Sequence, residues 1–407
     1  MKNKVVITGL GLTTPMGIGV ANSWKKATSG RTYIRKIKSI PTETLRTKLA
    51  GEITGLNFQD YFPDIRPDRM DRSTLLALVS AQEALKDAGL DSHRDRGNTG
   101  VMVGTCFSTV QTRESTYLRL AVTEEGMSPL LFLKSMDNAA AGEIAIRFGL
   151  KGINQTIFTA CSASTMALGE AYRLIREGYA DRILVGGTES PITRFTIRGW
   201  EKLHLISDTA SPNEISSPFS LNRNGLILGE GSGFLVLESE KVANARNSKI
   251  YGSIIGFGTN CDGIHLATPD SDSQSRAILA ALKEAKIKKE SIRYINLHGT
   301  GTKMNDKVET DAIKKVWGPT ATQIPMSATK SQIGHTMGAC GAIETVLTLL
   351  MMQKKELLPT VQFSPGDPDC DLDYIPDHSR KIQELDYAMK VSFGFGGSNA
   401  VLILKNA

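Results

Sequence analysis

The chain has 407 residues, 41% of them apolar and 22% charged, a balance typical of a folded globular protein and unlike that of a disordered one. Its net charge of +6 comes without any dense tract of lysine and arginine, which argues against nucleic-acid binding and favours acidic protein partners or anionic groups. No stretch approaches the roughly 20 apolar residues that span a bilayer, so we expect no membrane insertion.

Five cysteines occur at spacings that suit neither a zinc site nor a disulfide framework. They are Cys106, Cys161, Cys261, Cys340 and Cys370. An odd number of cysteines without C-x-x-C pairs is typical of a reducing compartment. We therefore expect a cytoplasmic location and no bound metal.

The first predicted elements are an apolar strand at residues 5–11 and an amphipathic helix that includes residues 75–79. Arg66, Arg69 and Arg72 lead into that helix and give it a basic edge. These arginines are candidates for binding an acidic partner. A solvated helix face without any partner explains them equally well.

A pattern of strand, helix, turn and strand occurs twice in the chain. The matching pairs are 7–11 with 255–258, 84–90 with 281–287, and 101–105 with 294–300. Two related α/β halves predict layered sheets covered by helices, with a functional site where the repeated strand-to-helix turns meet. We expect one half at residues 1–250, including a cap or insertion at about 190–225, and the other at residues 251–407.

Cys161 lies among small residues where a predicted strand turns into a helix. The N–H groups and dipole at a helix N-terminus favour a thiolate, so we expect a lowered thiol pKa and a nucleophilic role. The small neighbours Ala160, Ser162 and Ala163 leave room for an acyl group at the sulfur. A buried cysteine that only packs as a small apolar side chain is the alternative.

Two histidines of the second half occupy glycine-containing turns. His298 ends an apolar strand, and the glycines after it permit backbone angles that direct a side chain into a cleft. His335 lies between Lys330 and Glu344, which are a candidate ion pair for holding this turn, or else solvated surface charges. Either histidine alone could be an ordinary loop residue. Together with Cys161 they suit an enzyme that forms a thioester and stabilises a carbonyl-derived anion.

Near its end the chain has a strand at residues 389–392 followed by Phe-Gly-Phe-Gly-Gly-Ser-Asn. Such a loop can present a backbone N–H to an oxyanion, and Phe395, between Gly394 and Gly396, could move to admit substrate. A plain β-hairpin with packed phenylalanines is the structural alternative. Phosphate binding is disfavoured because neither G-x-G-x-x-G after a first strand nor a P-loop lysine is present.

Over its whole length the chain resembles the β-ketoacyl-acyl carrier protein synthases of the thiolase-like family. The resemblance is carried by residues 5–11, the Cys161 turn, residues 218–233, both histidine turns and the Phe-Gly-Phe-Gly-Gly loop. It implies a thiolase-like fold, in which duplicated α/β halves form α-β-α-β-α layers. The Cys-His-His set distinguishes the chain from synthases of the initiating type, which use Cys-His-Asn.

The resemblance implies a ping-pong decarboxylative Claisen condensation without a bound cofactor. Cys161 would accept an acyl group from the phosphopantetheine arm of an acyl carrier protein, and malonyl-carrier protein would then lose CO2 and attack the thioester. His298 and His335 would bind the malonyl thioester oxygen, and the N–H groups of Cys161 and Phe395 would form an oxyanion hole. The remaining implied roles are organisation of His335 by Lys330 with Glu344, structural support by Thr300 and Thr302, and carrier-protein binding by Arg66, Arg69 and Arg72.

Two subfamilies are similar to this chain. Residues 370–376 and the C-terminal loop resemble fatty-acid elongating type II synthases, whereas residues 301–306 resemble the ketosynthase subunits of bacterial type II polyketide systems. The latter pair with a chain-length-factor homologue that lacks the cysteine, so either a homodimer or such a heterodimer is expected. Arg-Asn-Gly at 223–225 departs from the family's Arg-Asp-Gly, and residues 106–111 would line the acyl pocket or a dimer interface.

Two other functions fit the sequence less well. A non-catalytic chain-length factor would have lost the nucleophile, so Cys161 disfavours it. A degradative thiolase would act on coenzyme A thioesters with a second cysteine; Cys340 follows His335 but falls in a predicted helix.

Overall fold

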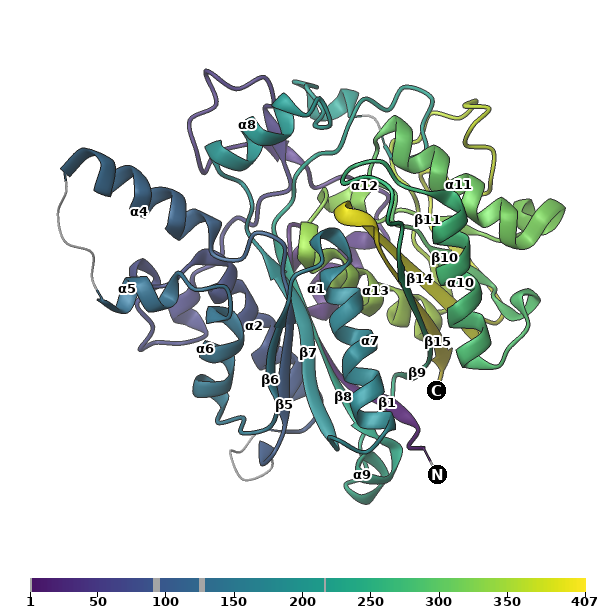
Figure 1. Cartoon of the computed structure of the whole chain (residues 1–407), viewed down its shortest axis with the longest axis horizontal. Coiled ribbons are helices and arrows are strands. Elements are labelled where there is room, and N and C mark those ends of the chain that lie inside the picture. Colours follow the sequence, from purple (N-terminus) through teal and green to yellow (C-terminus); the bar gives the residue numbers. More distant parts are fainter. Residues whose placement is uncertain (1, 91–95, 124–128, 216) are drawn as a thin grey trace.

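The computed structural model describes residues 2–90, 96–123, 129–215 and 217–407. Its main sheet runs through ten strands, with the short β2 Gly17–Ile18 attached to β1 (Figure 1). In spatial order these are β11 Met326–Ser327, β10 Tyr294–Asn296, β14 Tyr387–Gly394, β15 Ser398–Asn406, β9 Gly252–Cys261, β1 Val5–Thr14, β8 Gly231–Ser239, β7 Arg182–Glu189, β5 Gly100–Gly104 and β6 Asn154–Ile157. Two small sheets pair β3 Arg35–Lys36 with β4 Leu49–Ala50 and β12 Glu356–Leu357 with β13 Arg380–Lys381.

The strand order is symmetric about the antiparallel β1–β9 pair. From β1 outward the neighbours β8 and β7 are antiparallel, and β5 and β6 then continue parallel to β7. From β9 outward, β15, β14, β10 and β11 repeat the same sequence of directions. The internal repeat seen in the sequence therefore corresponds to two halves of one sheet, and the expected boundary near residue 250 falls between α9 Glu240–Ala245 and β9.

Helices cover both halves of the sheet and also lie between them. α7 Ala163–Arg176 and α13 Cys340–Lys354 contact strands of both halves, whereas α2 Arg72–Asp87 and α6 Ala139–Phe148 cover the first half, and α10 Ser271–Ala285 and α11 Lys303–Trp317 cover the second. The layers are therefore α-β-α-β-α, as the resemblance implied. The other α-helices given for the described ranges are α1 Val20–Ala27, α4 Val110–Thr123, α5 Pro129–Lys134, α8 Arg194–Lys202 and α12 Lys330–Ile333.

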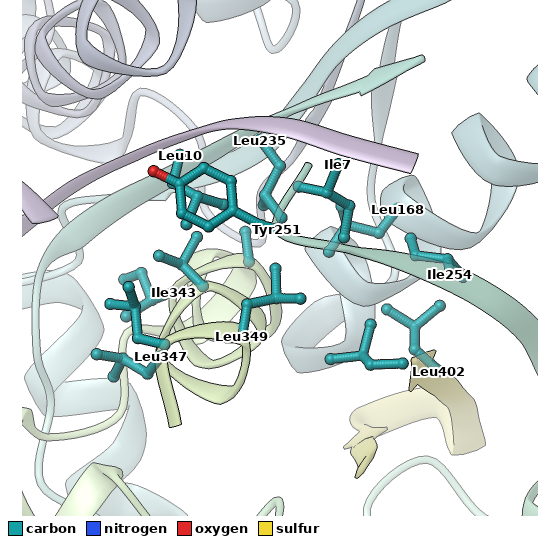
Figure 2. Packing of buried hydrophobic residues seen from close by; sticks show 14 of the residues in the cluster. Ile7, Leu10, Leu168, Leu235, Tyr251, Ile254, Ile343, Leu347, Leu349 and Leu402 are labelled. Atoms are coloured by element: carbon teal, nitrogen blue, oxygen red, sulfur yellow. The ribbon is translucent and has the colours of Figure 1, made fainter. Parts of the chain in front are cut away.

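The central layer is almost entirely apolar and buried. Figure 2 shows Ile343, Leu347 and Leu349 of α13 in one cluster with residues of β1 and β8 such as Leu10 and Leu235. Every residue of β1 and β8 is buried, which explains why these strands lack the alternation of apolar and polar residues that a half-exposed strand shows.

Matching local features build the outer helix of each half. α2 begins after Asp71, whose carboxylate accepts the N–H of Ser73, and α10 begins after Asp270, which caps it in the same way. Each helix then packs closely on its strand. The glycines that permit this are Gly9 and Gly11 in β1 and Gly256 and Gly258 in β9, where an added Cβ would lie under 3.0 Å from a helix carbonyl oxygen.

Two further sequence expectations concern the cap and the membrane. Residues 190–225 contain α8 and lie over the end of the sheet where the repeated turns meet.

Of the helices in the described ranges, none combines the length and apolar composition needed to cross a membrane.

Candidate active site

Cys161 is in the turn that joins β6 to α7. The turn is a 3-10 segment, Ala160–Ser162, that enters α7 directly, and Ala160 has a φ of 51°, so the backbone bends sharply just before the cysteine. The predicted position at a helix N-terminus is thus observed, but the expected lowering of the thiol pKa is not. Burial, reinforced by the charge of Cys340, raises the pKa of Cys161, and the nearby Lys330 opposes this only in part.

His335 is in hydrogen-bonding contact with the thiol. Its Nε2 lies 3.1 Å from Cys161 Sγ, while its Nδ1 accepts the N–H of Met337 at 3.1 Å. Burial, with the charges of Lys330 and Lys390, lowers the pKa of this imidazole well below 6.5. His335 is therefore neutral, and because Nδ1 is an acceptor, the ring proton is on Nε2 and points at the sulfur.

His298 follows β10 and meets the edge of the His335 ring, with 5.4 Å between ring centroids. The N–H groups of His298 and Gly299 donate to the buried carboxylate of Glu309 at 2.6 and 2.8 Å, which fixes the turn. Burial lowers the pKa of His298 well below 6.5 and raises that of Glu309 to about 7. Ligand-type atoms of Cys161 and the two histidines all lie within 4.8 Å of one another, so one carbonyl oxygen could contact both rings beside the sulfur.

Lys330 and Glu344 do form an ion pair, but it is fully internal and is shared with Lys390. Lys330 Nζ lies 2.6 Å from one oxygen of Glu344, Lys390 Nζ lies 2.7 Å from the other, and none of the three residues is more than 4% exposed. Lys330 Nζ also donates to the carbonyl oxygen of His298 at 2.5 Å. The side-chain contacts of Lys330 thus hold the His298 turn, whereas the sequence pointed to His335, and the surface alternative is wrong.

The Phe395 turn lies against the Cys161 turn. An added Cβ on Gly394 would come 2.8 Å from the carbonyl oxygen of Thr159, so only glycine permits this approach. The Phe395 ring stacks on Trp200 of α8 with 5.5 Å between centroids, and the N–H of Gly396 donates to Leu266 at 2.7 Å. Since β14 and β15 pair, the segment is a hairpin as well as part of the site, and the two alternatives from the sequence coincide.

A cavity of about 240 Å³ leads to these groups. Thr300 and Thr302 line it, their hydroxyl oxygens lie 2.9 Å apart, and Thr302 caps α11. Other lining residues come from the cap and the residue after it, from the loop after β9, from α10, from the first turn of α11 and from the C-terminal hairpin. They are Trp200, Leu203, Leu205, Leu226, Asp262, Leu266, Ala267, Thr268, Pro269, Gln274, Met304, Asn305, Phe393, Gly394, Phe395, Gly397 and Asn399.

The three candidate arginines separate into two kinds. Arg66 and Arg69 are exposed at the short 3-10 turn Pro67–Arg69. Arg72 begins α2 and is committed internally, with its guanidinium 2.7 Å from Glu230 and 2.8 Å from the carbonyl oxygen of Ile53. The charge of Arg72 is therefore paired within the fold while 29% of its side chain stays exposed, and its contact with a partner stays a prediction.

Several buried charged residues near the site were not predicted from the sequence. Glu189 accepts the N–H groups of Cys106, Phe107 and Gly338 and so joins the turn after β5 to the turn before α13. Lys390 and Glu309 complete the network around the histidines. The one sequence feature that indicates this network is Lys390 inside the apolar strand 389–392, because a charge in such a strand requires a buried partner.

Known proteins are similar to this chain in sequence and in architecture. Family models for the β-ketoacyl synthase N-terminal and C-terminal domains match residues 2–243 and 251–364. A 3-oxoacyl-[acyl-carrier-protein] synthase 2 from Staphylococcus aureus (strain COL) is 38% identical over 408 residues, covering 99% of this chain and 98% of the relative. The solved structure of the ishigamide ketosynthase/chain length factor superposes with a TM-score of 0.94 at 30% identity, each chain being covered completely. A type II polyketide synthase acyl-carrier protein in complex with its ketosynthase gives a TM-score of 0.90 at 30% identity, again with complete coverage of both chains.

Proposed function

The chain belongs to the β-ketoacyl synthase family, whose members are condensing acyltransferases, and from that premise we propose how its own residues divide the condensation reaction. One observation carries the proposal. The Cys161 thiol and two neutral imidazoles converge within 4.8 Å at the end of one cavity. The reaction is decarboxylative condensation of malonyl-carrier protein with an acyl chain held on the cysteine, as in fatty-acid or type II polyketide synthesis.

In the first half-reaction Cys161 receives the acyl chain. Its Sγ forms a bond to the thioester carbon, the bond from that carbon to the sulfur of the phosphopantetheine arm breaks, and the thiol proton passes to the leaving sulfur. The His335 Nε2–H donates toward Sγ and stabilises the developing thiolate, which matters because burial disfavours that charge. The N–H groups of Cys161 and Phe395 are assigned to the oxyanion of the tetrahedral intermediate, in keeping with the contact between their turns.

In the second half-reaction the two histidines act on the malonyl thioester. The bond to CO2 breaks, its electron pair becomes an enolate, and the enolate carbon attacks the acyl carbon as the bond to Cys161 Sγ breaks. The thiolate then takes a proton from solvent. His298 and His335 donate hydrogen bonds to the enolate oxygen, and the cluster of Lys330, Lys390 and Glu344 leaves one positive charge nearby to balance the enolate.

Partners are proposed from exposed surfaces and from the relatives. The exposed Arg66 and Arg69 are assigned to binding of the carrier protein, and one solved relative is a ketosynthase in complex with an acyl-carrier protein. α4, which extends from the body in Figure 1, exposes Tyr117, Leu118 and Val122 by 61% to 82% and is assigned to a dimer contact, with an identical chain or with a chain-length-factor homologue. Changing Leu118 and Val122 to Glu should then shift the protein to monomer in size-exclusion chromatography.

The halves at residues 1–250 and 251–407 are proposed as the two domains, and both contribute to the site. This assignment is supported by the symmetry of the sheet. The cytoplasmic location, and the absence of a bound metal or other cofactor, stay predictions.

The direct test is the intact mass of the protein after incubation with acyl-carrier protein, followed by malonyl-carrier protein and product detection. Wild type should gain one acyl group and release it as a β-ketoacyl product, and Cys161→Ala should gain none. Cys370→Ala, which removes a buried thiol remote from the cavity, serves as the matched control and should behave as wild type. An adduct that persists in Cys161→Ala would refute the assignment of the nucleophile.

A further inference from the structure

Besides His298, whose Nδ1 is unpaired, two buried side chains in the cavity wall carry polar atoms that have no partner among the residues that the structure describes. Gln274 of α10 is 0% exposed, and both its amide nitrogen and its amide oxygen are unpaired. Trp200 of α8 is 6% exposed, and its indole N–H is unpaired. They come from different helices, one from the cap over the first half and one from the second half.

Unpaired buried polar groups are rare in folded proteins, because the group loses its bonds to water and gains nothing in return. A cavity wall that holds two such groups is therefore incomplete without an occupant. The occupant must accept a hydrogen bond from the indole N–H, and beside Gln274 it must offer an acceptor, a donor or both.

Carbonyl-bearing substrate segments satisfy these requirements. The phosphopantetheine arm has two secondary amides, each with one N–H and one C=O, and the primary amide of Gln274 can pair with both groups of a secondary amide. A growing poly-β-keto chain instead offers only C=O groups. An unsubstituted hydrocarbon chain offers neither and would leave both side chains unpaired.

We propose that Gln274 and Trp200 are substrate-positioning residues that hydrogen-bond carbonyl groups of the substrate inside this cavity, those of the phosphopantetheine arm or those of an oxidised chain. The inference rests on the proposed function, because it takes the carrier-bound thioester as the ligand. It adds two recognition groups, one from α8 and one from α10, to the three groups that perform the chemistry.

The proposal makes stability and substrate affinity change in opposite directions. Gln274→Met keeps the length of the side chain and removes its polar atoms, so the free protein should melt at the same or a higher temperature while KM rises by about 3- to 10-fold with little change in kcat. Trp200→Phe keeps an aromatic ring against Phe395 and removes only one donor, so a smaller rise in KM is expected.

Thr74→Val is the matched control. Thr74 in α2 is 2% exposed and its hydroxyl is also unpaired among the described residues, but it does not line the cavity. Removing that hydroxyl should raise the melting temperature in the same manner as Gln274→Met and leave KM unchanged.

The substrates distinguish the source of the carbonyl group. Each variant is assayed with a saturated acyl-carrier protein, with the same acyl group on N-acetylcysteamine, which lacks the distal amide of the arm, and with 3-oxoacyl-carrier protein. A rise in KM for carrier-bound substrates that shrinks with the truncated thioester identifies the arm, and a rise confined to the 3-oxo substrate identifies the chain. An unchanged KM for every substrate in Gln274→Met overturns the inference.

The same assay separates this inference from the proposed function. If wild type forms no acyl adduct, the function fails whatever Gln274 does. If wild type is acylated normally and Gln274→Met matches it in KM throughout, only the inference fails.

Discussion

The turn before α7 and the turn before α13 occupy equivalent places in the two halves but have different surroundings. Each opens with a non-glycine residue at positive φ, Ala160 at 51° and Met337 at 42°, and each leads through a 3-10 segment into a buried central helix. The first turn is made of small uncharged residues and presents Cys161. The second lies beside the ion cluster of Lys330, Lys390 and Glu344 and follows His335.

The difference fits the proposed division of the reaction between the two turns. In that proposal the half with Cys161 supplies the thiol and a backbone N–H, whereas the half with the imidazoles supplies hydrogen-bond donors, the Phe395 N–H and one net positive charge. Because the central helices pack against strands of both halves, the two turns are held rigidly together. The comparison predicts that substitutions in the ion cluster of the second half weaken stabilisation of the enolate. It also predicts that equivalent substitutions under the outer helices of the two halves lower the free energy of unfolding by similar amounts.

The largest expected effect comes from breaking the ion cluster. Lys330→Met removes a cation that contacts both Glu344 and the carbonyl oxygen of His298, and the loss of one partner of a buried ion pair typically costs about 3–5 kcal/mol of stability. We expect such a loss in urea denaturation together with loss of decarboxylation.

Lys390→Met is the control for this prediction. It breaks the other bond of Glu344 without touching His298, so it should destabilise comparably and retain more activity. Equal activities in the two variants would contradict a special link between Lys330 and His298.

A medium effect is expected from the glycines under the outer helices. Gly9→Ala and Gly256→Ala each place a Cβ against a carbonyl oxygen of α2 or α10, and overpacking of this kind costs about 1–3 kcal/mol. The two variants should lose similar stability in urea titrations. A large difference between them would show that the halves do not share the same packing, whatever their strand order.

The smallest effect is a dependence of stability on pH. Burial depresses the pKa of His335 below its ordinary 6.5, so the unfolded state binds the proton more readily and stability falls as pH drops below that value, by up to about 1.4 kcal/mol per pH unit. Glu189 and Glu309, with pKa values raised to about 7, act in the opposite direction between pH 4.5 and 7.

Because these contributions overlap, the free energy of unfolding is measured for wild type and for His335→Gln from pH 7 to pH 5, and the variant's value is subtracted. This difference should decrease as the pH falls. His204→Gln, at an exposed position, is the control. A difference that stays constant over this range would mean that His335 is not held neutral.

The sequence predicted the fold, and it singled out the three residues that converge in the cavity, because both depend on local patterns. Small residues before a helix marked Cys161, and glycine turns after apolar strands marked His298 and His335. The charge state of Cys161 could not be predicted in the same way, since its pKa depends on burial by distant segments. The ion pair of Arg72 could not be predicted for a related reason, because its partner Glu230 is 158 residues away in the chain. Gln274 gave no signal at all, since only the folded cavity shows that its amide is unpaired.

The central claim is that acyl transfer to Cys161 and decarboxylation at His298 are separable steps, and acyl transfer and CO2 release measured in parallel test it most directly. With acyl-carrier protein, His298→Ala should still form the Cys161 adduct; with malonyl-carrier protein, it should release little CO2. Cys161→Ala should show the reverse, with no adduct and with CO2 release retained. Loss of both steps in both correctly folded variants would contradict the account, because it would mean that the nucleophile and the imidazole act only as one unit.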